Sequence, residues 1–400
     1  MTYNQPVRLG DILTFKRGYD LTAGERVPGP YPVFSSAGIT GYHNEYKVSG
    51  EAVITGRTGT IGEPYYFLGK YWPHNTSLYV KDFKDNDPRY IFYLLKCLGN
   101  LLSSGKSTVP GVDRNDLHEL KIPFIKSKSS QIAIRNVLWP IDQKLDFNKK
   151  IISNLEELAQ TIFKYWFVQF DFPDQDGRPY KSSGGKMIFD QHLKREKPSE
   201  WVTTNMDHLL EHSVTGLNPR NHFELGVGNN YYVTIRHIEN GKLNLGNNCD
   251  TIDDRALQLI NQRSQLEVGD ILFTSIEPVG LVYLIQQPPK NWNINESVFS
   301  LRPNKNLVTS EFLYFLLQSD FVKTFSKNVA AGSVHKGIRH ELLKSLELAV
   351  PSKKLIKSFT DHVSPILKSI NIYEKDSGEL EKLRDWLLPI LMNGKLEIQG

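Results

Sequence analysis

The sequence predicts a mixed α/β (α+β) protein in which two globular domains alternate with two long helices that pair as an antiparallel coiled coil. Three observations support this fold class. Two stretches have coiled-coil spacing, the remainder consists of short apolar runs broken by glycine and proline, and both patterns occur twice. The expected segments are a first domain at 1–126, a first helix at 127–170, a connector at 171–186, a second domain at 187–351, and a second helix with a tail at 352–400.

The first domain is expected to consist of strands and turns around one helix. Asp87 followed by Pro88 is a helix start, because Asp caps a first turn and proline fits the first helical position. Leu117–Phe124 is expected to form a short strand that leads into the first long helix. The other expected strands are Val7–Leu13, Ala52–Thr55, Tyr65–Leu68 and Ser77–Val80.

The first long helix carries a coiled-coil seam in which Asn148 is the only polar residue. A buried Asn148 would fix the register of the helix pair, and the alternative is that it faces water where the helices diverge. The seam residues are Leu138, Ile141, Leu145, Asn148, Ile152, Leu155, Ala159, Ile162 and Trp166, and the residues expected to widen the buried stripe are Ile134, Ile151 and Leu158.

The second long helix, from Lys354 to Met392, is the expected partner of the first. A helix of roughly 35–40 residues is about 55–60 Å long at about 1.5 Å per residue, which would place the two domains more than one DNA turn apart. The expected contact residues of this helix are Phe359, Ile366, Ile370, Tyr373, Leu380, Leu387 and Ile390.

An internal repeat relates the two halves of the chain. Pro140 and Ile141 reappear 225 residues later as Pro365 and Ile366, and the order of the other elements is kept although the offset drifts between loops. Two similar domains imply two similar ligand sites at a set separation, and DNA is a ligand that is read in this way. Further matching segments are Gly50–Thr55 with Gly269–Thr274, and Tyr90–Leu95 with Phe312–Leu317.

Composition places the chain among ordinary globular proteins and offers little for catalysis. Its 400 residues are 40% hydrophobic and 23% charged with a net charge of +4, and Cys97 and Cys249 are its only cysteines. No apolar run suggests a signal peptide or a membrane span, so we expect a soluble, cytoplasmic protein. Gly105-Lys-Ser lacks the first glycine of a P-loop, and His335 and His340 lack a third metal ligand, so no enzyme or metal site is expected.

Four sequence segments, together with the order of the helices and domains, resemble the DNA-specificity subunits of type I restriction-modification enzymes. They are NKKIISNLEELAQTIFKYWFVQFDFP in the first helix, DGRPYKSSGGKM in the connector, TGLNPRNHFELGVGNNYYVTIRHIENGKL in the second domain and LRDWLLPILMNGKLEI at the end of the second helix. The resemblance covers nearly the whole chain. It implies that the two domains are target-recognition domains, each reading one half of a bipartite double-stranded DNA site.

The resemblance also implies partners and the absence of catalysis in this chain. The two helices would set the gap between half-sites and dock two modification (adenine-N6 methyltransferase) subunits, and restriction (nuclease and translocase) subunits would join the complex. S-adenosylmethionine would bind the modification subunit, so no cofactor is expected here. The alternative from another class is a coiled-coil scaffold or adaptor whose two domains bind protein or RNA, and salt-dependent binding to double-stranded DNA would distinguish the two.

Two groups of side chains are candidates for DNA contact, because cationic side chains bind phosphates while Arg, Asn and aromatic side chains read or pack on bases. The alternatives are a solvated loop for the first group and half-buried strand positions for the second. The first group, in the loops before the two long helices, is Lys106, Ser107, Thr108, Arg114, Ser333, His335, Lys336 and Arg339, and the second group is Tyr42, Asn44, Arg57, Arg220, Tyr232, Arg236 and His237.

Overall fold

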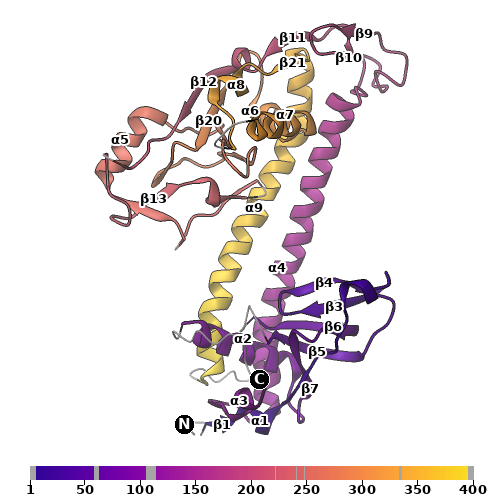
Figure 1. The fold of residues 1–400 in the computed structure, drawn as a ribbon, viewed down its shortest axis with the longest axis vertical. Coiled ribbons are helices and arrows are strands. Elements are labelled where there is room, and N and C mark those ends of the chain that lie inside the picture. Colours follow the sequence, from indigo (N-terminus) through magenta and orange to yellow (C-terminus); the bar gives the residue numbers. More distant parts are fainter. Residues whose placement is uncertain are drawn as a thin grey trace. The chain divides into compact units, whose positions relative to one another are not determined.

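The chain forms two compact units, one made of Met1–Ile151 with Ile372–Gly400 and the other of Ile152–Asn371. The computed structural model describes residues 6–57, 63–104, 114–220, 222–239, 241–246, 248–332 and 336–394. Each unit contains one globular domain and part of both long helices (Figure 1). Within these described ranges, no helix has the length and hydropathy needed to span a membrane.

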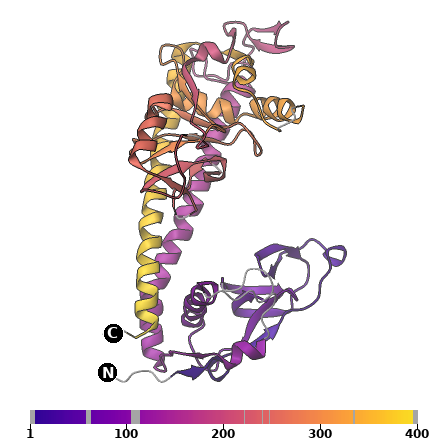
Figure 2. The ribbon, with the colours of Figure 1, turned by 60° about the vertical axis from the view of Figure 1, so that its left-hand side comes forward.

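The two long helices, α4 (Lys128–Phe163) and α9 (Lys353–Met392), run side by side and antiparallel (Figure 2). In the first unit, Arg384 of α9 donates to Asp142 of α4 at 3.1 Å. In the second unit, the rings of Phe163 and Phe359 lie 5.8 Å apart. A low residue number on α4 meets a high one on α9 in the first contact and the reverse holds in the second, so the predicted antiparallel coiled coil is confirmed.

Burial along the helices follows the predicted seam. Asn148 is fully buried, and its Nδ2 donates to Asp376 Oδ2 at 2.8 Å and to Ser377 Oγ at 3.2 Å, so it does not face water. Buried seam residues are Leu138, Ile152, Ala159, Trp166, Phe359 and Ile370, and half-buried ones are Ile141, Leu145, Leu155, Ile162, Ile366, Tyr373, Leu380, Leu387 and Ile390.

One flanking residue differs from the expectation. Leu158 was predicted to widen the buried stripe together with Ile134, yet its side chain is 49% exposed whereas Ile134 is buried. Two paired helices bury only a narrow seam. Leu155 and Ala159, on either side of Leu158 in the chain, occupy that seam, so Leu158 lies outside it. Ile134 is buried because the globular domain of the first unit covers that end of α4.

The first domain is built on a six-stranded sheet of order β2-β7-β5-β6-β3-β4. Helix α2 packs on this sheet, and Asp87 caps it by accepting from the amide of Tyr90 at 2.9 Å, as the sequence predicted. The elements are β1 (Val7–Arg8), α1 (Leu9–Ile12), β2 (Thr14–Arg17), β3 (Tyr31–Ser35), β4 (Gly38–His43), β5 (Val48–Gly56), β6 (Tyr65–Pro73), β7 (Ser77–Asp82), α2 (Pro88–Ser104), α3 (Arg114–Glu119) and β8 (Lys121–Ile122).

The segment predicted as a strand at Leu117–Phe124 is a short helix followed by a two-residue strand. Leu117 lies in α3 and packs with Leu120 against the core of the first unit, so their spacing of three is that of a helical turn. The apolar run alone did not reveal this, because short runs fit either structure.

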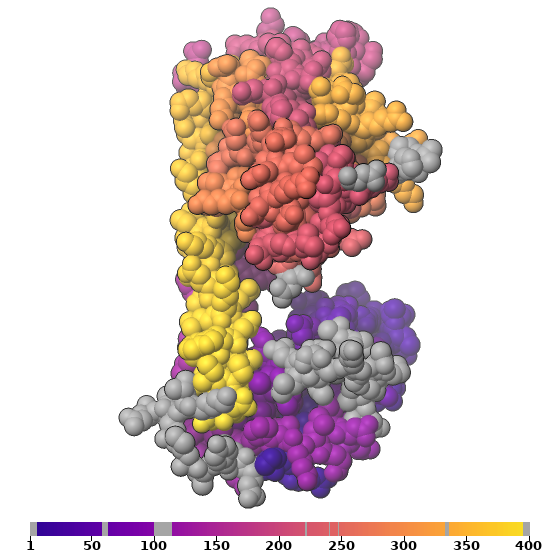
Figure 3. Space-filling view, turned by 90° about the vertical axis from the view of Figure 1, so that its left-hand side faces the viewer, coloured from indigo at the N-terminus to yellow at the C-terminus, as the bar shows by residue number. Residues whose placement is uncertain are grey.

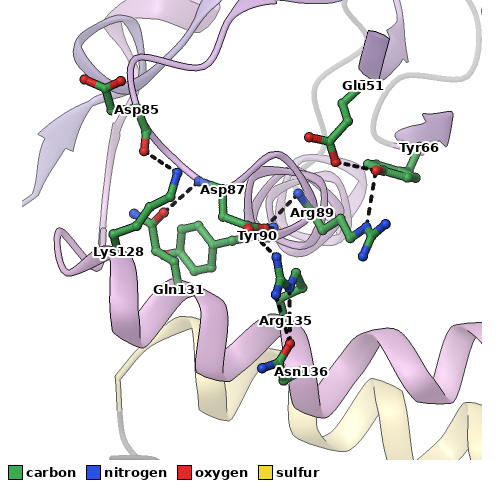
Figure 4. A network of polar contacts seen from close by, with 10 residues as sticks. All are labelled: Glu51, Tyr66, Asp85, Asp87, Arg89, Tyr90, Lys128, Gln131, Arg135 and Asn136. Carbon is green, nitrogen blue, oxygen red and sulfur yellow. Dashed lines mark hydrogen bonds and ion pairs between the residues drawn. The ribbon is translucent and has the colours of Figure 1, made fainter. Parts of the chain in front are cut away.

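A network of polar contacts joins the first domain to α4 (Figure 4). Arg135 Nη1 donates to Asp87 Oδ2 at 2.7 Å, so the residue that caps α2 also binds α4. Gln131 Oε1 accepts from the amide of Asp87 at 2.9 Å. The guanidinium of Arg89 lies 4.3 Å from the ring of Trp139, which adds a cation–π contact at the same joint.

The second domain repeats the first and adds elements to it. Its four-stranded sheet has the order β12-β20-β17-β18, which corresponds to β2-β7-β5-β6, while a three-stranded sheet of β16, β13 and β19 with helix α5 is an addition. The elements are β9 (Met187–Asp190), β10 (Arg195–Pro198), β11 (Val202–Asn205), β12 (Leu210–Thr215), β13 (Asn230–Val233), β14 (Ile238–Glu239), β15 (Lys242–Leu243), β16 (Asp250–Ile252), α5 (Asp254–Ser264), β17 (Ile271–Thr274), β18 (Val282–Leu284), β19 (Trp292–Ile294), β20 (Val298–Pro303), α6 (Ser310–Gln318), α7 (Asp320–Ala331), α8 (His340–Lys344) and β21 (Glu347–Val350).

Each domain packs against the start of one long helix and the end of the other. The core of the first unit contains Ile134 and Leu138 from α4 together with Leu388, Leu391 and Met392 from α9. In the second unit, Phe163 and Phe167 at the end of the first long helix pack with Phe312 of α6 and Phe359 of α9. The internal repeat therefore extends from sequence to packing.

Candidate nucleic-acid interface

An exposed surface on the first domain combines aromatic and cationic side chains. Tyr42 of β4 and Asn44 just after it are both exposed, as DNA contact requires. Nearby, Lys70 Nζ lies 4.8 Å from the ring centre of the exposed Tyr46, and Lys47 Nζ lies 4.5 Å from that of Trp72. Such interleaved rings and cations suit a sugar-phosphate backbone.

Arg57 follows β5 and is half-buried. Its amide donates to the carbonyl of Thr76 at 2.9 Å, so the chain after β5 is held beside the chain before β7. The segment between Pro73 and Ser77 has a counterpart in the second domain, where Asn295 and Ser297 match Asn75 and Ser77 but Glu296 stands at the position of Thr76.

The loops before the long helices are described only in part. Lys106, Ser107, Thr108, Ser333 and His335 lie outside the described residues. Arg114 is exposed at the start of α3, and Arg339 is exposed immediately before α8. Lys336 is exposed with a backbone φ of 46°, a conformation that holds its side chain on a tight turn.

The second group of candidates in the second domain divides into exposed and buried residues. Arg220 and Arg236 are exposed, whereas Tyr232 and His237 are buried and bonded to backbone. His237 Nδ1 accepts from the amide of Thr234 at 2.9 Å, and Tyr232 donates to the carbonyl of Leu217 at 2.7 Å. Tyr232 and His237 are therefore buried below the surface and support it.

A cavity of about 380 Å³ in the second domain is lined by three of the candidates. Tyr232, Arg236 and His237 line it, and so does Ile276. Ile276 pairs with Gly337, and the amide of Ile338 donates to Ser275 at 2.8 Å, so Lys336 and Arg339 belong to a segment tied to the cavity wall. The other lining residues are Asn218, Pro219, Leu225, Thr234, Ile235, Asn248, Asp250, Asn295, Glu296 and Ser297.

Charge inside the cavity is mixed. Burial, and then the carboxylate of Glu296, raise the pKa of the Tyr232 phenol, so its hydroxyl remains a donor. Glu296 Oε1 accepts from Asn218 Nδ2 at 2.6 Å, which orients the carboxylate. The cavity can therefore accept hydrogen bonds inside. Arg236 lines its wall, Arg220 follows the lining residue Pro219, and Lys336 precedes Gly337, the partner of the lining residue Ile276.

Sequence reasoning missed Asn218, Asp250 and Glu296, because the cavity joins segments far apart in the chain. A signal existed in the repeat, where His74-Asn-Thr-Ser77 matches Ile294-Asn-Glu-Ser297. Among the described residues there is no cluster of three His, Cys, Asp or Glu side chains suited to a metal. His340 contacts Ser213 Oγ through Nε2.

The family model of the type I restriction modification DNA specificity domain matches residues 2–157 and 198–382. The type I restriction enzyme MjaIX specificity subunit of Methanocaldococcus jannaschii is 23% identical over 314 residues, covering 78% of this chain and 69% of that protein. The HindI specificity subunit of Haemophilus influenzae is 24% identical over 361 residues, covering 77% of each.

A solved structure shares the fold. The crystal structure of the type I restriction-modification system S subunit from M. genitalium aligns with a TM-score of 0.63 at 18% identity, over 96% of this chain and 95% of that chain. The similarity extends over both globular domains and both long helices, as the coverage shows.

Proposed function

Because this chain belongs to the family of type I restriction-modification DNA specificity subunits, we propose that it recognises a bipartite double-stranded DNA target, with one half-site for each globular domain. The observation that carries this proposal is the duplicated sheet, β2-β7-β5-β6 in one domain and β12-β20-β17-β18 in the other. Two similar readers in one chain suit two short half-sites separated by unread base pairs.

The same proposal assigns the long helices to partner binding. Large apolar side chains are exposed at positions related by the repeat offset of 225 residues: Phe147 and Ile372 are 60% and 66% exposed, and Leu158 and Leu383 are 49% and 44% exposed. The side of α9 seen in the space-filling view is open at the surface (Figure 3). Matching apolar positions on both repeats suit two copies of one partner, since identical partners contact equivalent residues.

We infer that these partners are two modification subunits that methylate adenine N6, with restriction subunits joining the complex in the cytoplasm. S-adenosylmethionine would bind the modification subunit. In this scheme the present chain contributes recognition and spacing, and the catalytic groups belong to its partners.

A methylome tests the proposal. The chain is expressed with its cognate modification subunit in a host that lacks methylation, and N6-methyladenine is mapped by single-molecule sequencing. We expect a bipartite motif with a constant gap, of which one half changes when residues 187–351 are exchanged for those of a relative. A stable complex that leaves DNA unmethylated would contradict the proposal and favour an adaptor that binds protein or RNA.

A further inference from the structure

The cavity of the second domain contains a carboxylate, Glu296, on the domain proposed to face DNA. A carboxylate is repelled by phosphates, so a DNA-facing surface has no use for one as a backbone contact. Carboxylate oxygens only accept hydrogen bonds, and the donors that DNA offers in its major groove are the amino groups of cytosine and adenine. The chemistry of this side chain therefore points to a base edge.

The surroundings of Glu296 hold it in place and leave it accessible. Its Oε1 accepts from Asn218 Nδ2 at 2.6 Å, and its Oε2 lies 3.4 Å from the hydroxyl of the buried Tyr232. The single hydrogen of that hydroxyl goes to the carbonyl of Leu217 at 2.7 Å, so Oε2 keeps its capacity to accept. Glu296 itself is exposed.

The internal repeat supplies an independent argument. Thr55 pairs with Leu78 in the first domain and Thr274 pairs with Val298 in the second, so a turn precedes a matching strand pair in both domains. Asn and Ser flank the turn position in both domains, but the residue between them is Thr76 in one and Glu296 in the other. A matching sequence position with a different side chain is what two readers of different half-sites need.

Cations on the neighbouring segments complete the arrangement. Arg236 lines the same cavity, Arg220 follows the lining residue Pro219, and Lys336 precedes Gly337, which pairs with the lining residue Ile276. These three side chains are exposed and suit phosphates on either side of the base. Asp250 also lines the cavity. It lies on β16, which belongs to the sheet that is absent from the first domain, so the repeat offers no matching position for it.

We propose that Glu296 is a specificity-determining residue that accepts a hydrogen bond from the amino group of a base, cytosine N4, in the half-site read by the second domain. Cytosine is favoured over adenine because adenine presents its N7 acceptor beside the amino group, and N7 would repel the second carboxylate oxygen. This inference rests on the proposed function and adds the chemistry of one base contact to it.

The test compares the methylomes of the wild-type chain and of E296Q, E296A and E277Q, each with the cognate modification subunit. Glu277 is an exposed carboxylate next to Ile276 that does not line the cavity, so E277Q removes the same charge nearby. We expect E296A to accept several bases at one position of the second-domain half-site, and E296Q to shift that position toward adenine, which glutamine binds through N6 and N7. The gap, the other half-site and the motif of E277Q should stay unchanged.

Each outcome decides the matter. An unchanged motif in both Glu296 variants overturns the assignment while the proposed function stands, and an unmethylated wild-type sample overturns both. If the Glu296 variants methylate nothing, competition binding with duplexes that carry single-base changes replaces the methylome. Loss of discrimination of roughly tenfold at one base pair supports the assignment. Equal weakening on every duplex shows a structural role and overturns it.

Discussion

Replacing Arg135 with threonine tests how the first domain is joined to α4. The Asp87 side chain is 6% exposed and that of Arg135 is 27% exposed, so the substitution leaves a buried carboxylate oxygen without its cation. Removing one partner from a fully buried ion pair costs about 3–5 kcal/mol. Because Arg135 is partly exposed and Asp87 keeps its bonds to the amides of Arg89 and Tyr90, we expect a loss of about 2–3 kcal/mol.

The second unit supplies the matched control. There the residue that caps α6, Thr309, contacts Thr360 of α9 through their hydroxyls at 2.7 Å, and Thr360 is the repeat equivalent of Arg135. D87T keeps a capping hydroxyl and frees Arg135 to turn toward water, so it should cost only about 1 kcal/mol. The double variant D87T/R135T recreates the threonine pair and should also cost about 1–2 kcal/mol, which gives a coupling of about 2 kcal/mol.

Thermal unfolding and hydrogen exchange measure this cycle. R135T should lower the melting temperature of the first unit by roughly 5–10 °C, from about 2–4 °C per kcal/mol for a unit of this size. Faster hydrogen exchange in peptides from α2 and α4 would assign the loss of stability to the first unit and not to the second. Losses that simply add in the double variant would refute the reasoning, because they would show that Asp87 and Arg135 do not depend on each other.

Three other predictions concern DNA, partners and pH. Lys336→Ala should weaken DNA binding and reduce the slope of log affinity against log salt by about 0.9 if this side chain neutralises one phosphate, and an unchanged slope excludes it. Phe147→Asp or Ile372→Asp should each remove one modification subunit from the complex, and the double variant both. Native mass spectrometry that still finds two copies would contradict this docking surface. Burial, and then Lys344, lower the pKa of His340. The unfolded state therefore binds more protons, so the free energy of unfolding of the second unit should fall as the pH drops below about 6.5. Urea unfolding at pH 5 and 7.5 measures this fall, which should be smaller in His340→Gln.

The features that the sequence predicted are those with a local or repeated pattern. The seam from Leu138 to Trp166 was found because helical periodicity is a property of neighbouring residues, and the cap at Asp87 because it needs only the next three residues. Because each element occurs twice, the repeat allowed each one to be recognised in two places. The structure confirms the predicted order of domain, helix, domain and helix.

Apart from the short helix α3, the features that it did not predict depend on contacts that the local sequence does not show. The three-stranded sheet places β19 parallel to β13, about 60 residues earlier, and nothing local signals such a pairing. The cavity likewise joins Asn218, Tyr232, Ile276 and Glu296 from four segments. Leu158 was misjudged because an apolar residue beside a seam looks the same in sequence whether a domain, a partner or water covers it.

The packing of α9 against the first domain has a consequence for synthesis on the ribosome. Leu388, Leu391 and Met392 belong to a core whose other members begin at Leu9, so that core lacks three of its buried side chains until α9 has left the exit tunnel. The unit of Ile152–Asn371 is continuous in the chain and has all its residues earlier. We therefore expect the half of the protein that is made first to finish folding last.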